Sequence, residues 1–214
     1  DPEVPPTSIA ELDQMAETLT VEEGDLITRM GHMPYNYWLW AAPYNGSFYD
    51  ADAREVTANA PENVEMFEWM ASYSEKYDVT KVQAFQQGLA SERSGILDPF
   101  ISERIAIHEV GGAWKLGDFT KYAEEGVSFG ITAAPTPGGT GDVTTYSYGD
   151  FTVVPKGSES PSEAWRFVKY TGGLGGTLED YFKVLTWGGR PINVPVTTQI
   201  LDYEPFKETV AAYP

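Results

Sequence analysis

Residues 105–114, which read Ile-Ala-Ile-His-Glu-Val-Gly-Gly-Ala-Trp, constrain the fold more than any other stretch of the chain. Ile105 and Ile107 alternate with smaller or polar residues, which predicts a short strand in a mixed environment. Two glycines follow, the second being Gly112, and they allow a sharp turn and a close approach to the backbone. Trp114 comes next. Because α/β folds bind ligands outside the carboxyl ends of their strands, Trp114 is a candidate ligand contact. The alternative is an aromatic that caps the core.

Patterns typical of strands and helices alternate along the chain, which predicts an α/β fold. Strands are predicted at residues 26–33, 105–110, 127–131 and 151–154, and helices at the caps 8–11, 59–62 and 160–163 and at residues 177–185. The core face of the helix that follows residues 59–62 is predicted to hold Val64, Phe67, Met70, Ala71 and Tyr77. The Pro/Gly-rich residues 135–141 are the best candidate for a crossing between domains.

The charge of the chain excludes several classes of partner. The chain has 32 acidic and 14 basic residues, a net charge of −18, so nucleic acid and anionic lipid are disfavoured. No apolar run is long enough to insert into a bilayer.

The chain has no cysteine, and its two histidines, His32 and His108, lie far apart in the sequence. We therefore expect no metal and no cofactor.

Aromatic residues are more abundant than a core of this size needs, with 6 Trp, 13 Tyr and 10 Phe. Trp and Tyr suit flat amphipathic ligands such as sugars. They are densest in residues 34–49, where no single period fits them all, so we expect some of them to project into a cleft.

The two ends of the sequence suggest a piece of a longer protein. Residues 1–6 resemble a proline-rich linker rather than a signal peptide, and the last residues lie within a helical pattern that begins at Phe206.

Several segments, in order and over nearly the whole chain, resemble one family: the extracellular solute-binding proteins of sugar-type ABC importers, such as the maltose-binding protein family. The segments that carry the resemblance are residues 5–12, 46–50, 59–64, 105–114, 154–167 and 189–191. The resemblance implies a periplasmic-binding-protein-like fold with two lobes, one of them incomplete in this chain. Residues 1–145 would form most of the second lobe, and residues 146–214 part of the first lobe after a hinge crossing.

The resemblance also implies a set of ligand contacts in a cleft between the lobes. Trp114 would stack on a sugar face beside the backbone at Gly112. Trp40 matches a cleft aromatic, with core packing as its alternative, and for Trp38 and Tyr44 the same two readings stay open.

Three further residues match segments that reach the cleft in the family. Tyr148 and Asp150 lie where the chain resembles the crossing that lines the cleft, and Asp150 would accept hydrogen bonds from sugar hydroxyls unless it is a solvated loop residue. Arg190 would clasp a hydroxyl or carboxylate, or else pair with one of the many acidic residues.

The function implied by the resemblance is non-catalytic binding of a sugar or oligosaccharide. Hinge closure would follow binding, and the ligand would pass to the membrane permease subunits of an ABC importer. The protein would act outside the cytoplasm, in the periplasm or at the cell surface, and would be a monomer. Two alternatives stay open: a glycoside hydrolase that uses paired carboxylates, and a structural or adhesive surface protein.

Overall fold

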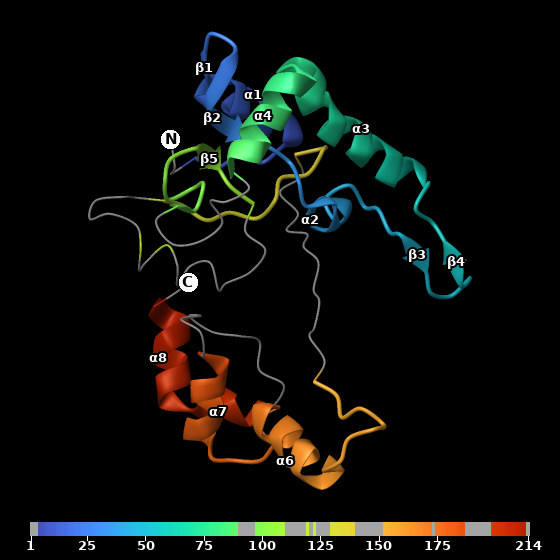
Figure 1. Cartoon of the computed structure of the whole chain (residues 1–214), viewed down its shortest axis with the longest axis vertical. Helices are drawn as coiled ribbons and strands as arrows, with labels where there is room; N and C mark the ends of the chain where they lie inside the picture. Colours follow the sequence, from blue (N-terminus) through green and yellow to red (C-terminus); the bar gives the residue numbers. More distant parts are fainter. Residues whose placement is uncertain are drawn as a thin grey trace. The chain divides into compact units, whose positions relative to one another are not determined.

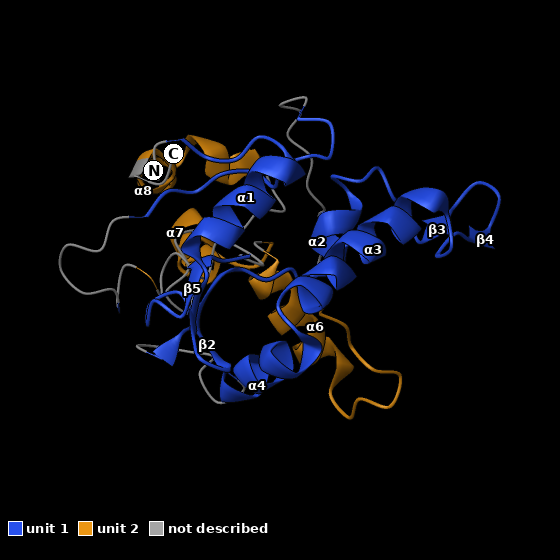
Figure 2. Cartoon of the chain, turned by 90° about the horizontal axis from the view of Figure 1, so that it is seen from above, with its two compact units in different colours: residues 1–109, 122–147 blue, residues 110–121, 148–214 orange. Residues whose placement is uncertain are grey.

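The computed structural model describes residues 4–89, 97–109, 119, 122, 129–139, 152–172, 174–186 and 198–212. The chain divides into two compact units, shown in blue and orange in Figure 2. Unit 1 consists of residues 1–109 and 122–147, and unit 2 of residues 110–121 and 148–214. The assignment of residues 1–145 and 146–214 to two lobes stays a prediction.

A three-stranded sheet with the order β1-β2-β5 organises the described part of unit 1 (Figure 1). β1 (Val21–Glu23) pairs antiparallel with β2 (Leu26–His32), and β2 pairs in parallel with β5 (Ile105–Ile107). Met30 lies opposite Ile105 in the parallel ladder. The strands predicted near residues 26 and 105 are therefore confirmed.

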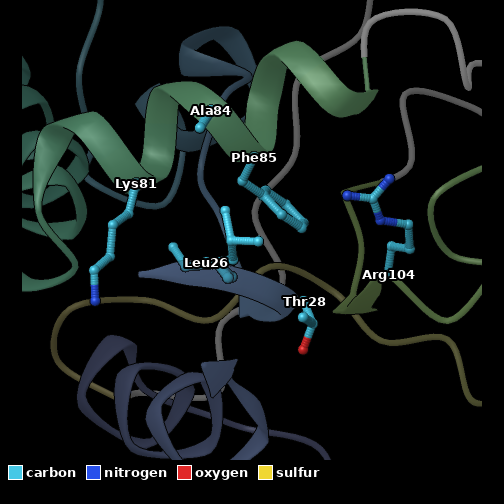
Figure 3. A pocket seen from close by; sticks show the side chains of 7 residues that line it. Leu26, Thr28, Lys81, Ala84, Phe85 and Arg104 are labelled. Carbon is cyan, nitrogen blue, oxygen red and sulfur yellow. The ribbon is translucent and has the colours of Figure 1, made fainter. Parts of the chain in front are cut away.

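Helices α1 (Ile9–Leu19) and α4 (Val79–Leu89) pack on β2 from opposite faces (Figure 3). The predicted cap of α1 is confirmed: Ser8 Oγ accepts from the Glu11 backbone N–H at 3.2 Å, and the Glu11 carboxylate accepts from the Ser8 N–H at 3.3 Å. Helix α1 approaches β2 so closely that a Cβ atom at Gly31 would overlap the carbonyl group of Ala16. The absence of a side chain at Gly31 therefore permits this packing.

Helix α2 (Tyr37–Ala41) leads into the hairpin of β3 (Tyr49–Asp50) and β4 (Glu55–Val56). Figure 1 shows α3 (Pro61–Lys76) running from this hairpin toward α4. Asn63 of α3 is fully buried, and its Nδ2 donates to the carbonyl oxygens of Ser47 at 2.7 Å and Thr57 at 2.9 Å. One buried amide thus joins α3 to both sides of the hairpin.

The predicted core face of α3 is wrong in part. Val64 and Phe67 are 42% and 43% exposed, and Ala71 is exposed as well. The buried residues are Asn63, Met66, Tyr73 and, at the C-cap, the correctly predicted Tyr77. Apolar residues occur all around α3, so their spacing alone does not select a face.

The strands predicted at residues 127–131 and 151–154 are absent from the described residues of both segments. Residues 129–131 and 152–154 are not in strands. The other residues of the two predicted strands lie outside the described part of the chain. An extended segment becomes a strand only through a partner strand, which alternation of residue types does not supply.

The described part of unit 2 is helical, with α6 (Pro161–Thr171), α7 (Leu178–Leu185), the 3-10 helix η3 (Thr198–Asp202) and α8 (Glu204–Ala212). Its core consists of Tyr181, Leu185, Ile200 and Phe206. Thr177 and Asp180 form a capping box at the start of α7, where Thr177 Oγ1 accepts from the Asp180 N–H at 3.1 Å. The helix predicted at residues 177–185 is therefore confirmed.

Candidate functional site

The carboxyl ends of the parallel strands β2 and β5 lie side by side, with His32 opposite Ile107 in the ladder. The chain leaves the two strands through residues 33–36 and 108–109. We call residues 32–36 and 107–109 the carboxyl edge. Such edges are where open α/β sheets bind ligands. The segment that contains Trp114 follows this edge in the sequence, so the carboxyl edge is the candidate site.

Glu109 is the centre of the hydrogen bonding at the carboxyl edge. Its residue exposure is 5%. Its carboxylate accepts from Trp40 Nε1 at 2.6 Å and from the backbone N–H groups of Asn36 at 2.9 Å and Tyr35 at 3.2 Å. The phenol of Tyr35 donates in turn to the main-chain carbonyl of Glu109 at 3.0 Å. These contacts attach the start of α2 to the residues that follow β5.

His32 lies beside this carboxylate and is only 1% exposed. Its Nδ1 lies 3.1 Å from the Ile107 carbonyl oxygen, which requires Nδ1 to carry the hydrogen and donate it. Its Nε2 lies 3.7 Å from Glu109 Oε1 and has no hydrogen-bond partner within the described residues. The rings of Trp40, Trp69 and Tyr73 pack around it, with centroid distances of 5.8, 6.5 and 5.8 Å.

Burial moves the pKa values of this pair in opposite directions. Desolvation lowers the pKa of His32 to about 4, so its imidazole is neutral at pH 7. Desolvation raises the pKa of Glu109 to about 7, although the hydrogen bonds from Trp40, Asn36 and Tyr35 favour its charged form. Glu109 therefore changes charge near neutral pH.

An exposed aromatic surface accompanies this buried pair. Tyr35 is 50% exposed, and its ring stacks on His108 with a centroid distance of 6.1 Å and an interplanar angle of 26°. His108 in turn stacks on Phe100 at 6.4 Å. The dense aromatic stretch in the sequence includes Tyr35, but Tyr35 is not among the predicted ligand contacts. Its position just after a strand is the signal that could have found it.

Three of the predicted ligand contacts, Trp38, Trp40 and Tyr44, lie in the described part of the chain. They do not all face the same side of α2. Trp40 and Tyr44 are 2% and 7% exposed and lie in one core cluster, whereas Trp38 is 51% exposed. Residues two positions apart on an α-helix differ by about 200° around its axis, so Trp38 and Trp40 face opposite sides of α2. Tyr44 lies one turn after Trp40 and shares its side. Direct ligand contact by each of the three stays a prediction.

Trp38 belongs to a surface cluster of four rings that also includes Tyr37, Phe48 and Phe67. The rings of Trp38 and Phe48 are perpendicular, with centroids 4.9 Å apart. Tyr37 lies 4.9 Å from Trp38 and 5.9 Å from Phe67. The exposed indole is thus supported by its neighbours.

The other predicted contacts lie outside the described residues; they are Gly112, Trp114, Tyr148, Asp150 and Arg190.

The described residues contain no group of three or more His, Asp or Glu side chains that could hold a metal ion. Within the same residues, no helix has the length and apolar character needed to cross a membrane.

A pocket shown in Figure 3 lies at the opposite ends of the same strands. Its lining includes Leu26 and Thr28 from the first half of β2 and Arg104, which precedes β5. The two cations on its wall have partners: Lys81 Nζ binds Glu22 Oε2 at 2.6 Å, and the Arg104 guanidinium lies over the ring of Phe85 at 5.2 Å. Because its lining lies at the amino ends of β2 and β5, the pocket is separate from the carboxyl edge.

The chain is similar to one family of bacterial proteins and to two solved structures. A family model described as bacterial extracellular solute-binding protein matches residues 2–213. The solved structure of CpMnBP1 with mannobiose bound matches 99% of this chain with a TM-score of 0.68 and 26% identity. CpMnBP1 with mannotriose bound matches 99% of this chain with a TM-score of 0.68 and 27% identity. The chain spans about half the length of CpMnBP1, 53% and 54% in the two structures. No curated protein matches the chain.

Proposed function

The chain belongs to the family of bacterial extracellular solute-binding proteins, and from this premise we propose that it binds an oligosaccharide without transforming it. The observation that carries the proposal is the similarity to CpMnBP1, which holds mannobiose in one structure and mannotriose in the other. A ligand built from mannose units is therefore the first candidate.

The chemistry of the carboxyl edge supports a neutral polyhydroxylated ligand. The C–H groups of a sugar ring pack on an aromatic face, while its hydroxyls bind polar groups around the edge of that face. Tyr35 presents such a face, half exposed, next to the segment that leads to Trp114. The net charge of −18 disfavours phosphorylated ligands.

We assign roles to the predicted residues accordingly. Trp114 and Tyr35 stack on sugar rings, and Trp38 offers a further exposed indole. Gly112 permits close approach of the backbone. Tyr148, Asp150 and Arg190 bind hydroxyl groups. Trp40 and Tyr44 remain predicted ligand contacts, and the buried Trp40 also supports the site through its hydrogen bond to Glu109.

The proposal extends to the partners of the protein. Ligand binding closes two lobes by hinge motion, and the closed monomer delivers the sugar to the permease subunits of an ABC importer. Family membership supports this delivery step.

Titration calorimetry of the full-length protein tests the proposal. Mannobiose and mannotriose should bind saturably at one ligand per protein, and chromatography should recover them unchanged. Trp114→Ala should abolish binding, whereas Trp165→Ala, which removes a 54% exposed tryptophan of α6, should retain it. No saturable binding of either sugar, or release of shorter products, would contradict the proposal.

A further inference from the structure

We propose that Glu109 is a positioning residue for carbohydrate binding, and that its ionised carboxylate fixes Tyr35 and the first turn of α2 where the segment leading to Trp114 begins. Ligand affinity then depends on the charge of a side chain that does not touch the ligand. The proposal rests on the proposed function, since it concerns the same site.

The first step is the attachment of Tyr35 at both ends to one residue. Its backbone N–H donates to the side chain of Glu109 at 3.2 Å, and its phenol donates to the main-chain carbonyl of Glu109 at 3.0 Å. The ring is therefore held beside Glu109, with half of its surface exposed. A displacement of Glu109 would turn or release the ring.

The second step is the orientation of α2. Asn36 is the N-cap of this helix: its Oδ1 accepts from the Leu39 N–H at 3.3 Å, while its own N–H donates to Glu109 at 2.9 Å. Trp40, one turn later, donates its indole N–H to the same carboxylate at 2.6 Å. Two attachment points fix the rotation of a short helix, and with it the direction of Trp38 on the opposite side.

The third step is the requirement for negative charge. An ionised carboxylate only accepts hydrogen bonds, so it suits the N–H groups of Tyr35, Asn36 and Trp40 together. A protonated acid or an amide accepts fewer bonds and introduces a donor among these donors. Protonation of Glu109 should therefore loosen both the Tyr35 ring and the first turn of α2.

The surroundings of Glu109 place this change near neutral pH. On β2, His32 Nε2 lies 3.7 Å from the carboxylate, and burial keeps the pKa of this imidazole low. Asp13 of α1 interacts electrostatically with His32. The ring of Tyr73 of α3 packs on His32, and Tyr73 donates to Asp13 at 2.7 Å. His108 precedes Glu109 and packs on Tyr35. Because burial raises the pKa of Glu109 to about 7, affinity should fall as the pH falls through neutrality.

The test is calorimetric titration of the full-length protein with mannotriose between pH 5.5 and 8.5. Wild-type affinity should fall on the order of tenfold from pH 8.5 to 5.5, as expected for weakened charge-assisted hydrogen bonds. Glu109→Gln should bind on the order of tenfold more weakly at pH 8.5, with affinity independent of pH over this range.

A second variant keeps the proposal testable if Glu109→Gln does not fold. Trp40→Phe preserves an aromatic ring in the core but removes the indole N–H that favours the ionised carboxylate. Its affinity should therefore decline with a midpoint at higher pH than that of the wild type. Loss of packing alone would leave the midpoint unchanged.

The matched control is Glu11→Gln. The Glu11 carboxylate also accepts backbone N–H groups, those of Thr7 at 2.8 Å and Ser8 at 3.3 Å, at the exposed start of α1. This variant should lose stability and keep both the affinity and its pH profile. Equal effects of Glu11→Gln and Glu109→Gln on affinity would overturn the positioning role. So would unchanged binding by Glu109→Gln, although the proposed function would then stand. If the wild type binds neither mannobiose nor mannotriose, the proposed function fails and the positioning role fails with it.

Discussion

The indole N–H of Trp40 donates to the carboxylate of Glu109 over 2.6 Å, although the two residues are 69 positions apart in the sequence. Both residues are almost fully buried. This hydrogen bond joins the aromatic stretch that contains α2 to the strand that leads to Trp114. It thereby connects residues 34–49 with residues 105–114, the two segments in which the sequence predicts ligand contacts.

The titration of Glu109 should be visible in stability. Its folded-state pKa of about 7 exceeds its ordinary value of 4.5, so the folded protein binds the proton more tightly than the unfolded chain. Its contribution is complete below pH 4.5 and is lost as the pH rises through 7. The unfolding free energy of the wild type minus that of Glu109→Gln should fall by about 3 kcal/mol over this range. Urea unfolding at several pH values measures it, and a difference that rises or stays level would contradict the prediction.

Gly31→Ala should destabilise unit 1, because the new methyl group would overlap the carbonyl group of Ala16 in α1. Separation of helix and strand by overpacking costs about 1–3 kcal/mol. Gly157→Ala is the matched control, since nothing lies within 4 Å of the added atom, and it should change stability by less than about 0.5 kcal/mol. Thermal unfolding of both variants checks the prediction, and equal melting temperatures would count against the close packing of α1 on β2.

Asn63→Asp should detach α3 from the β3–β4 hairpin. The substitution keeps the size of the side chain but replaces the donor to Ser47 and Thr57 with an oxygen that repels both carbonyls. We expect a loss of at least about 2 kcal/mol, because the group is buried. Asn59→Asp, at an exposed position just before α3, should be nearly neutral. Denaturant unfolding distinguishes the two, and similar midpoints would show that the buried amide has no such role.

The two tryptophans of α2 should respond differently to truncation. Trp40→Ala removes a core ring that is 2% exposed and should cost about 3–5 kcal/mol. Trp38→Ala removes a 51% exposed ring and should cost less than about 1.5 kcal/mol. Unfolding curves of the two variants give the comparison directly. A larger loss for Trp38→Ala would contradict the orientation of α2, in which Trp40 faces the core and Trp38 the surface.

Local patterns in the sequence predicted the family and the fold class, and both predictions are confirmed. The family model matches residues 2–213 and describes extracellular proteins, in agreement with the predicted location outside the cytoplasm. The match to CpMnBP1 covers 99% of this chain but only about half of CpMnBP1, in agreement with a partial two-lobed α/β fold. The cap at Ser8 was readable as well, because a capping box involves residues only three apart. The caps predicted at residues 59–62 and 160–163 do precede helices α3 and α6, but no side-chain cap hydrogen bond forms at Ala60 or Ser160.

Tertiary structure decided what no local pattern contains. Spacing could not tell which side of α2 or α3 is buried, because apolar residues occur on several sides of both helices. Nor could it assign the roles of Tyr35 and Glu109, since these depend on the parallel pairing of β2 with β5. The sequence by itself determined the kinds of elements and their order, through interactions between near neighbours. Which aromatic residues are buried and which carboxylate holds them was decided only when segments 69 positions apart came into contact.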